Sequence, residues 1–156
     1  MNELENLERE KFGTVPETGL AITIDPYLGI NSINKIKELL KAIIKIEQSN
    51  TSDDKTWEDN LPNWFVSKTK NISREDLFKN SQLWDFGSWI DAIKQRGWKW
   101  WSYKTTKDKT VIYLETHSYP YNIDPFFYIL YTVGVDFKQT EVFEIYPDSE
   151  NLKVIK

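Results

Sequence analysis

The sequence predicts a single α+β domain in which about four mostly antiparallel strands pack with helices. Residues 98–103 and 137–146 change character with a period of two, which is the period of a strand. Residues 33–44 instead place isoleucine and leucine three and four positions apart, which is the period of a helix. With 156 residues, 40% of them hydrophobic, the chain is long enough to bury one core and short for two. We therefore expect one domain spanning residues 1–156.

The N-terminal third is predicted to contain one strand and one long helix. Residues 1–19 are polar, with scattered glycine and proline, and predict a short helix and a loop that are poorly ordered. Residues 20–24 predict a buried strand, and the helix that follows runs to about Glu47. Residues 49–60 predict an acidic loop. We place this loop inside the domain, because the chain on either side of it is too small for a good core of its own.

The middle of the chain predicts two helices and a hairpin. Ser73 caps a short helix, and a second helix begins near Asp85. Strands over 98–103 and 110–117 are joined by a polar turn and form a β-hairpin.

The last two elements are a buried helix and a strand. Residues 125–133 carry no charge and are apolar nearly all round, so this should be the most buried helix, and Gly134 should end it. The strand 137–146 follows. Without the small helical insert, the order of elements is βαββαβ, which is the order of the split βαβ or ferredoxin-like arrangement.

Composition excludes several classes of chemistry. The chain has no cysteine, which removes disulfides, thiolate nucleophiles and most structural zinc sites. Its single histidine removes metal sites and acid–base mechanisms that need two. We expect no cofactor and no catalysis. The longest uncharged apolar stretch, 125–135, is too short to cross a bilayer, and the start of the chain is acidic, so we expect a cytoplasmic protein without a membrane partner.

Charge is unevenly distributed around a net value of −4. Residues 1–60 hold 12 acids and 7 bases, residues 61–110 hold 5 acids and 10 bases, and residues 111–156 hold 7 acids and 3 bases. The whole-chain charge argues against non-specific binding of nucleic acid.

Two groups of acids are candidates for docking a basic protein partner. The loop group is Asp53, Asp54, Glu58 and Asp59, and the C-terminal group is Glu141, Glu144 and Asp148. The loop group lacks the ligand spacing of a calcium-binding EF-hand. Glu141 and Glu144 are three residues apart, so they cannot share one face of a regular strand.

Two further classes of function stay open. Basic residues alternate with aromatic ones in 96–109, a pattern suited to stacking on the bases of single-stranded nucleic acid, although Trp98 and Trp100 also fit a core. A small enzyme would use His117 with Glu115 and Tyr119, which alternate at the end of a strand.

The stretch from Trp57 to about Val135 contains a series of tryptophan, proline, glycine and aspartate motifs. They are Leu61-Pro-Asn-Trp-Phe65, Ser73-Arg-Glu-Asp-Leu77, Leu83-Trp-Asp-Phe-Gly-Ser-Trp89, Arg96-Gly-Trp-Lys-Trp-Trp101, Tyr119-Pro-Tyr121, Asp124-Pro-Phe126 and Gly134. This series resembles small bacterial immunity proteins of contact-dependent growth inhibition and related polymorphic toxin systems. The resemblance covers about half of the chain and leaves residues 1–56 outside it.

The resemblance implies a non-enzymatic protein that binds a cognate toxin C-terminal domain and neutralises it in the cytoplasm. It supplies no catalytic residues. Many such toxins are nucleases with basic clefts, so an acidic surface would steer association and block the cleft. The sequence alternative is the nucleic-acid-binding module built on 96–109.

Overall fold

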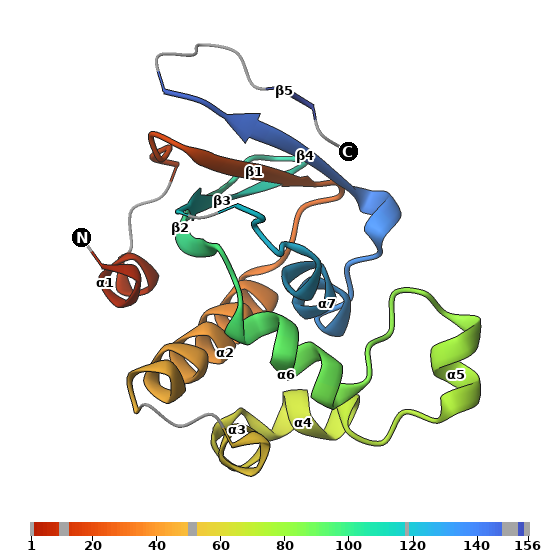
Figure 1. Ribbon diagram of the computed structural model, residues 1–156. Helices are drawn as coiled ribbons and strands as arrows, with labels where there is room; N and C mark the ends of the chain where they lie inside the picture. Colours follow the sequence, from red (N-terminus) through yellow and green to blue (C-terminus); the bar gives the residue numbers. More distant parts are fainter. Residues whose placement is uncertain (1, 10–12, 50–52, 118, 148–152, 155–156) are drawn as a thin grey trace.

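An antiparallel sheet forms one layer of the protein, and helices cover one of its faces (Figure 1). The computed structural model describes residues 2–9, 13–49, 53–117, 119–147 and 153–154. Its strands are β1 (Gly19–Ile24), β2 (Trp98–Thr105), β3 (Thr110–Thr116), β4 (Thr140–Ile145) and the two-residue β5 (Lys153–Val154). Its helices are α1 (Glu3–Glu8), α2 (Ile30–Gln48), α3 (Asp54–Asn60), α4 (Asn63–Thr69), α5 (Arg74–Lys79), α6 (Phe86–Lys94) and α7 (Asp124–Thr132), with a 3₁₀ turn, η1, at Phe137–Gln139.

The strand order is β2-β3-β1-β4-β5, and every neighbouring pair is antiparallel. Strand β3 lies between β1 and β2, so β1 and β2 run in the same direction with one strand between them. This is the split βαβ arrangement, and it confirms the predicted α+β class and the βαββαβ order. Helices α5 and α6 form the predicted helical insert between α2 and β2, and α3 and α4 precede them in the same connection. The short β5 at the edge was not predicted.

One continuous core joins the sheet to the helices. Strand β1 turns Leu20, Ile22 and Ile24 toward the helices, and all three side chains are buried. Trp98 and Trp100 from β2 are 0% exposed in the same core. These two tryptophans therefore belong to the core, which is one of the two roles that the sequence allows for them, and Trp89 on α6 is buried as well. Trp84 is only partly buried against the core.

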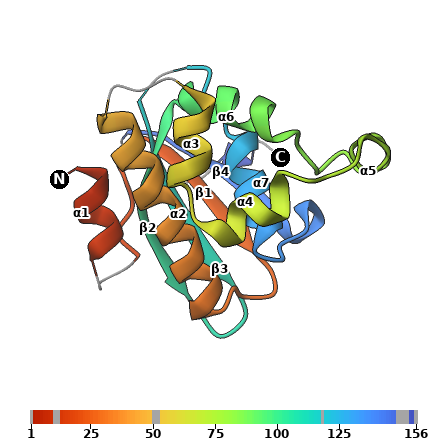
Figure 2. The same ribbon diagram turned by 90° about the horizontal axis from the view of Figure 1, so that it is seen from below.

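Helix α7 lies under the sheet beside α2 (Figures 1 and 2). Phe126, Ile129 and Leu130 of this helix are buried, as the uncharged stretch 125–133 predicts. Gly134 ends it with a φ of 99°. The Gly134 backbone N–H donates to Tyr131 O, and that of Val135 donates to Leu130 O, both at 3.0 Å, which is a Schellman C-terminal motif.

Two segments depart from the sequence predictions. Residues 49–60, predicted as an acidic loop, contain helix α3, because Asp53 caps it and Trp57, 2% exposed, packs into the core. The poor order predicted for 1–19 is wrong for α1, because Leu7 is 1% exposed in the same core and Glu3 is held in a buried ion pair. Helix α4 was not predicted.

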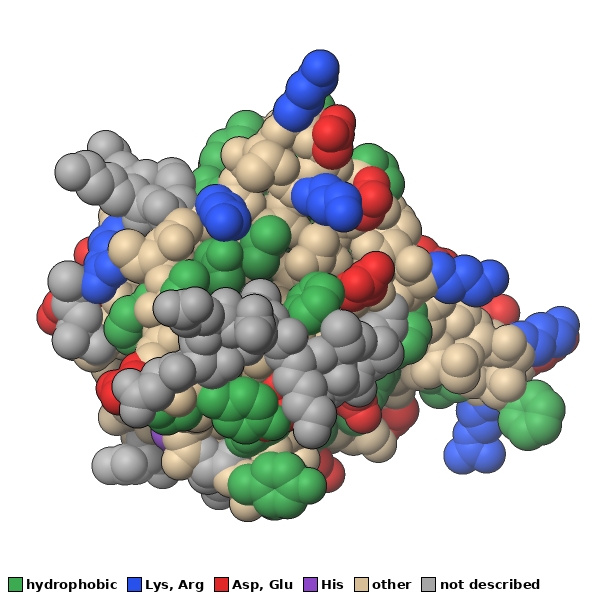
Figure 3. All heavy atoms as spheres, turned by 90° about the horizontal axis from the view of Figure 1, so that it is seen from above, with side chains coloured by type: hydrophobic (Ala, Val, Ile, Leu, Met, Phe, Trp, Pro, Cys, Tyr) green, Lys and Arg blue, Asp and Glu red, His purple; other side chains and the backbone are tan. Residues whose placement is uncertain are grey.

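No helix of the described residues covers the other face of the sheet (Figure 1). Ala21, Tyr113 and Ile145 form a small second cluster there, with Trp101 and Phe143 against it. Figure 3 views this side of the molecule, where hydrophobic side chains lie between acidic and basic ones. Among the described residues, no helix is long and apolar enough to cross a membrane.

Candidate protein-binding surface

Helix α3 carries the first group of acids. The carboxylate of Asp53 accepts a hydrogen bond from the backbone nitrogen of Lys55 at 3.1 Å and caps the helix. The carboxylate of Asp54 lies 3.2 Å from the ammonium group of Lys94 on α6. These two acids therefore belong to a helix tied to its neighbour, and not to the adaptable loop that the sequence predicts for this part of 49–60.

The other two acids of α3 are also paired with lysines. Glu58 lies 2.9 Å from the ammonium group of Lys70 and 3.7 Å from that of Lys55. Asp59 lies 3.2 Å from Lys55. Lysine ammonium groups thus lie beside Asp54, Glu58 and Asp59. The negative field at this surface is therefore weaker than the four carboxylates alone would produce.

Strand β4 separates the two described acids of the C-terminal group. Glu144 pairs in register with Leu20, whose side chain is in the core, and Glu141 pairs with Thr23 on the other face. The two glutamates therefore project from opposite faces of the sheet, as their spacing predicts. Asp148 lies outside the described residues.

Three tyrosines gather around Glu144 near the end of β4. The hydroxyl of Tyr121 donates to Glu144 Oε1 at 3.2 Å, and that of Tyr146 donates to Oε2 at 2.6 Å. The ring of Tyr119 meets that of Tyr121 edge-on, with centroids 5.4 Å apart. Tyr119 is 86% exposed and Tyr146 is 39% exposed. We call Tyr119, Tyr121, Glu144 and Tyr146 the tyrosine–glutamate cluster.

The electrostatics of this cluster favour a carboxylate that accepts from neutral phenols. Burial, reinforced by the charge of Glu144, raises the pKa of Tyr121. The hydrogen bond to Glu144 raises the pKa of Tyr146. Both hydroxyls therefore keep their protons at neutral pH and hold both carboxylate oxygens in place.

The backbone of this region is fixed to the start of β2. Gly97 N donates to Tyr121 O at 2.9 Å, and His117 N donates to Gly97 O at 3.0 Å. The connection between β3 and α7 thus presents Tyr119 and Tyr121 from an anchored backbone. Exposed aromatic side chains on an anchored backbone are typical of a surface prepared for a protein partner.

The candidate acid–base residues lie at the end of β3 and just beyond it. Within the described part of the chain, no hydrogen bond joins the side chains of Glu115, His117 and Tyr119. Partial desolvation of the imidazole, together with the charges of Lys99 and Arg96, lowers the pKa of His117. The histidine side chain is exposed at the surface.

Three residues of the basic aromatic stretch 96–109 are buried. Trp98 and Trp100 are 0% exposed, and the side chain of Arg96 is 5% exposed, so these three residues cannot lie against a nucleic acid. Trp101 is partly exposed, and Lys99, Lys104, Lys107 and Lys109 are exposed.

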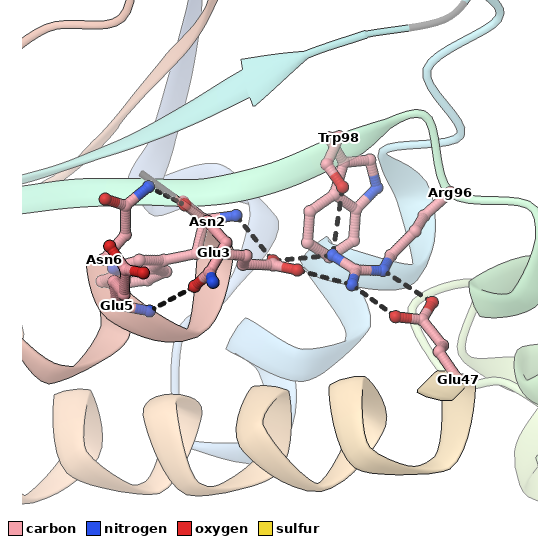
Figure 4. A network of polar contacts seen from close by, with 8 residues as sticks. Asn2, Glu3, Glu5, Asn6, Glu47, Arg96 and Trp98 are labelled. Carbon is pink, nitrogen blue, oxygen red and sulfur yellow. Dashed lines mark hydrogen bonds and ion pairs between the residues drawn. The ribbon is translucent and has the colours of Figure 1, made fainter. Parts of the chain in front are cut away.

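Arg96 instead joins three parts of the fold (Figure 4). Its guanidinium donates to both carboxylate oxygens of Glu3, at 2.7 and 2.8 Å, and to both of Glu47, at 2.8 and 3.1 Å. It also donates to Trp98 O at 3.0 Å. Burial alone would lower the pKa of Arg96, but hydrogen bonds and charge from the two glutamates outweigh it and raise that pKa. The arginine is a structural cation.

The tyrosine–glutamate cluster is not among the sites that the sequence predicts. The Tyr119-Pro-Tyr121 motif belongs to the resemblance, and Tyr146 ends the predicted strand 137–146. The available signal was aromatic residues next to turn-forming proline, outside any apolar period. Among the described residues, no group of three or more histidine, cysteine, aspartate or glutamate side chains is arranged to hold a metal ion.

Comparisons with known proteins were made against family models, curated proteins and solved structures, and no match was found in any of the three.

Proposed function

We propose that this chain is a bacterial immunity protein that binds the C-terminal domain of a cognate toxin, a nuclease, and neutralises it in the cytoplasm. The observation that carries the proposal is the tyrosine–glutamate cluster. It combines a highly exposed tyrosine, Tyr119, with a carboxylate that two phenols hold in one position.

This chemistry suits a basic protein partner. Tyrosine is enriched among the residues that dominate binding energy, because it buries a large rigid surface and keeps a polar tip. A carboxylate already fixed by Tyr121 and Tyr146 loses little entropy when it meets a lysine or arginine. The basic substrate cleft of a nuclease offers both the cations and the concave surface.

The resemblance to immunity proteins supports the same proposal. Its motif residues Trp57, Trp89 and Trp98 are buried and maintain the fold. Tyr119 and Tyr121, which belong to the same series of motifs, reach the surface in the cluster. The motifs thus combine a structural core with one exposed position that a partner can contact.

The test is co-expression with the toxin domain encoded beside this chain. We expect the chain to restore growth of cells that express that domain, and to form a complex measurable by calorimetry. Replacing Tyr119, Tyr146 and Glu144 together (Y119A, Y146A and E144Q) should weaken the affinity about 100-fold or more, since each contact of this kind is worth about 1–2 kcal/mol.

Two matched variants serve as controls. Tyr27→Ala removes a tyrosine that is 55% exposed but outside the cluster, and should leave affinity unchanged. His117→Ala should still restore growth, because the proposal assigns no catalysis to the histidine. Absence of any complex, or of growth rescue by the unmodified chain, would contradict the proposed function.

A further inference from the structure

The two edges of the sheet differ in how far other segments cover them. At the β2 edge, side chains of α1 take both backbone groups of one residue: Trp100 N donates to Glu3 Oε2 at 2.8 Å, and Asn6 Nδ2 donates to Trp100 O at 3.3 Å. Further along, Ser102 Oγ donates to Thr14 O at 2.6 Å. The N-terminal segment therefore closes this edge against strand addition.

The β4 edge is much less covered. Within the described residues, its strand neighbour is β5, which pairs only at Phe143 with Val154 and at Glu144 with Lys153. Strand β4 itself is six residues long. An edge strand that pairs over only part of its length is a template for another extended chain.

Carboxylates flank this edge on both faces of the sheet. Glu141 is exposed on the open face of the sheet, and Glu144 with its tyrosines lies on the other face. Phe143, between them, is partly buried on the open face. A strand added here would meet a carboxylate on each face and an aromatic residue in the centre.

From this arrangement we infer that the β4 edge binds an extended basic segment of the partner, which adds to the sheet as a strand in the place of β5. The inference rests on the proposed function and identifies the part of the toxin that docks. Backbone hydrogen bonds supply affinity in this mode, and the side chains at alternate positions supply specificity. The carboxylates of Glu141 and Glu144 favour basic side chains in that segment.

Strand β5 then acts as an intramolecular competitor. A partner strand binds only molecules in which β5 has left the edge, so its apparent dissociation constant equals the intrinsic constant divided by the fraction of molecules in which β5 has left. Weakening β5 should tighten binding, which is the opposite of what a purely structural tail would do.

A short synthetic peptide tests the edge without the toxin. The probe is a capped octapeptide of alternating lysine and valine, titrated into the full ¹⁵N-labelled chain. We expect amide shifts to concentrate in Thr140–Ile145. A glutamate–valine octapeptide, and a peptide with four lysines followed by four valines, should give much smaller shifts, because one lacks the charge and the other lacks the alternation.

Three variants of the full chain sharpen the test. Lys153→Pro together with Val154→Pro removes the backbone donors of β5 and should lower the dissociation constant of the lysine–valine peptide about fivefold. Glu141→Lys together with Glu144→Lys should abolish the shifts. Asp76→Lys together with Asp91→Lys, at exposed acids on α5 and α6, makes the same change of charge outside the edge and should reduce binding far less.

The other outcomes overturn the inference. It fails if the shifts fall outside β4, if the acidic peptide binds equally well, or if the proline variant binds no better than the unmodified chain. It also fails if sedimentation shows that a second copy of the chain occupies the β4 edge. If the chain rescues growth but the toxin complex does not change hydrogen exchange in β4, only the inference about the β4 edge is overturned. If the peptide binds but no toxin complex forms, only the proposed function is overturned.

Discussion

Arg96 is the residue that fixes the N-terminal helix to the rest of the fold. The side chains of Arg96 and Glu3 are 5% and 6% exposed. A buried pair of this kind gives little net stability over an apolar pair, but removing one member leaves the other charge buried without a partner. Glu3 Oε2 also accepts from Trp100 N, so the same carboxylate holds α1 against the edge of β2.

Arg96→Met should therefore lower the free energy of unfolding by about 3 kcal/mol, as measured by urea denaturation. Adding Glu3→Gln to this variant should restore part of the loss, because the uncompensated carboxylate is then gone. Arg74→Met, at an exposed arginine on α5, is the matched control and should change stability by less than about 0.5 kcal/mol. Equal losses in the two single variants would show that Arg96 has no special role.

Tyr128 gives a pH dependence whose sign follows from its burial. It is 2% exposed, and burial followed by the effect of Tyr131 raises its pKa above the usual value for tyrosine. The unfolded chain then loses the phenolic proton at lower pH than the folded chain. The stabilising contribution is complete below about pH 10 and is lost as the pH rises toward the higher folded pKa.

We expect the free energy of unfolding to fall between about pH 9 and about pH 11, and Tyr128→Phe to reduce that fall. Phenylalanine keeps the ring and removes the titrating group, so the comparison cancels the contribution of lysines that titrate in the same range. Chemical denaturation at the two pH values makes the measurement. A fall of the same size in the variant would contradict the assignment.

Among the elements, α3 and β4 present their acids in different ways. The acids of α3 either cap the helix or lie within ion-pair distance of a lysine. Exposed pairs of this kind are weak, yet they reduce the field that reaches a distant partner. Glu144 on β4 is held by neutral phenols instead, so its charge is not offset by these contacts.

Neutralising Glu141 and Glu144 with glutamine should slow association with a basic toxin domain more than neutralising Asp54 and Asp59 with asparagine. Both double variants remove two negative charges, so the difference reports position and not net charge. Stopped-flow association rates at two salt concentrations give the comparison, and the β4 variant should show the flatter salt dependence. A larger effect of the α3 variant would place the interface on the acids of α3 instead.

At the scale of the whole molecule, the sequence predicts elements that local chemistry specifies. Gly134 ends α7, Ser73 and Asp85 cap α5 and α6, and the alternation around Trp98 marks β2. These signals act within a few residues and need no knowledge of the tertiary structure.

Features that depend on distant contacts were not predictable in the same way. Glu3 and Arg96 are 93 residues apart, and neither residue type signals burial by itself. The tyrosine–glutamate cluster brings Tyr121 from the β3–α7 connection to Glu144 on β4. Helix α3 was missed because its four acids suggested a solvated loop, although Asp53 followed by an apolar Trp57 is a usable start signal for a helix.

The helical insert and the sheet share one hydrophobic core. Trp57 from α3 and Trp98 from β2 belong to one cluster, with Phe65 and Trp89 in contact at a centroid separation of 4.6 Å between the insert's helices. Unfolding should therefore be a single cooperative transition, with fluorescence and far-ultraviolet circular dichroism giving the same midpoint in urea.

Trp57→Ala leaves a large cavity and should lower the free energy of unfolding by about 3–5 kcal/mol. Because the core is shared, that loss should lower hydrogen-exchange protection in β1 and β3 as well as in α3 and α4. Two separate transitions, or a loss of protection confined to the insert, would show instead that the chain divides into two folding units near residue 55.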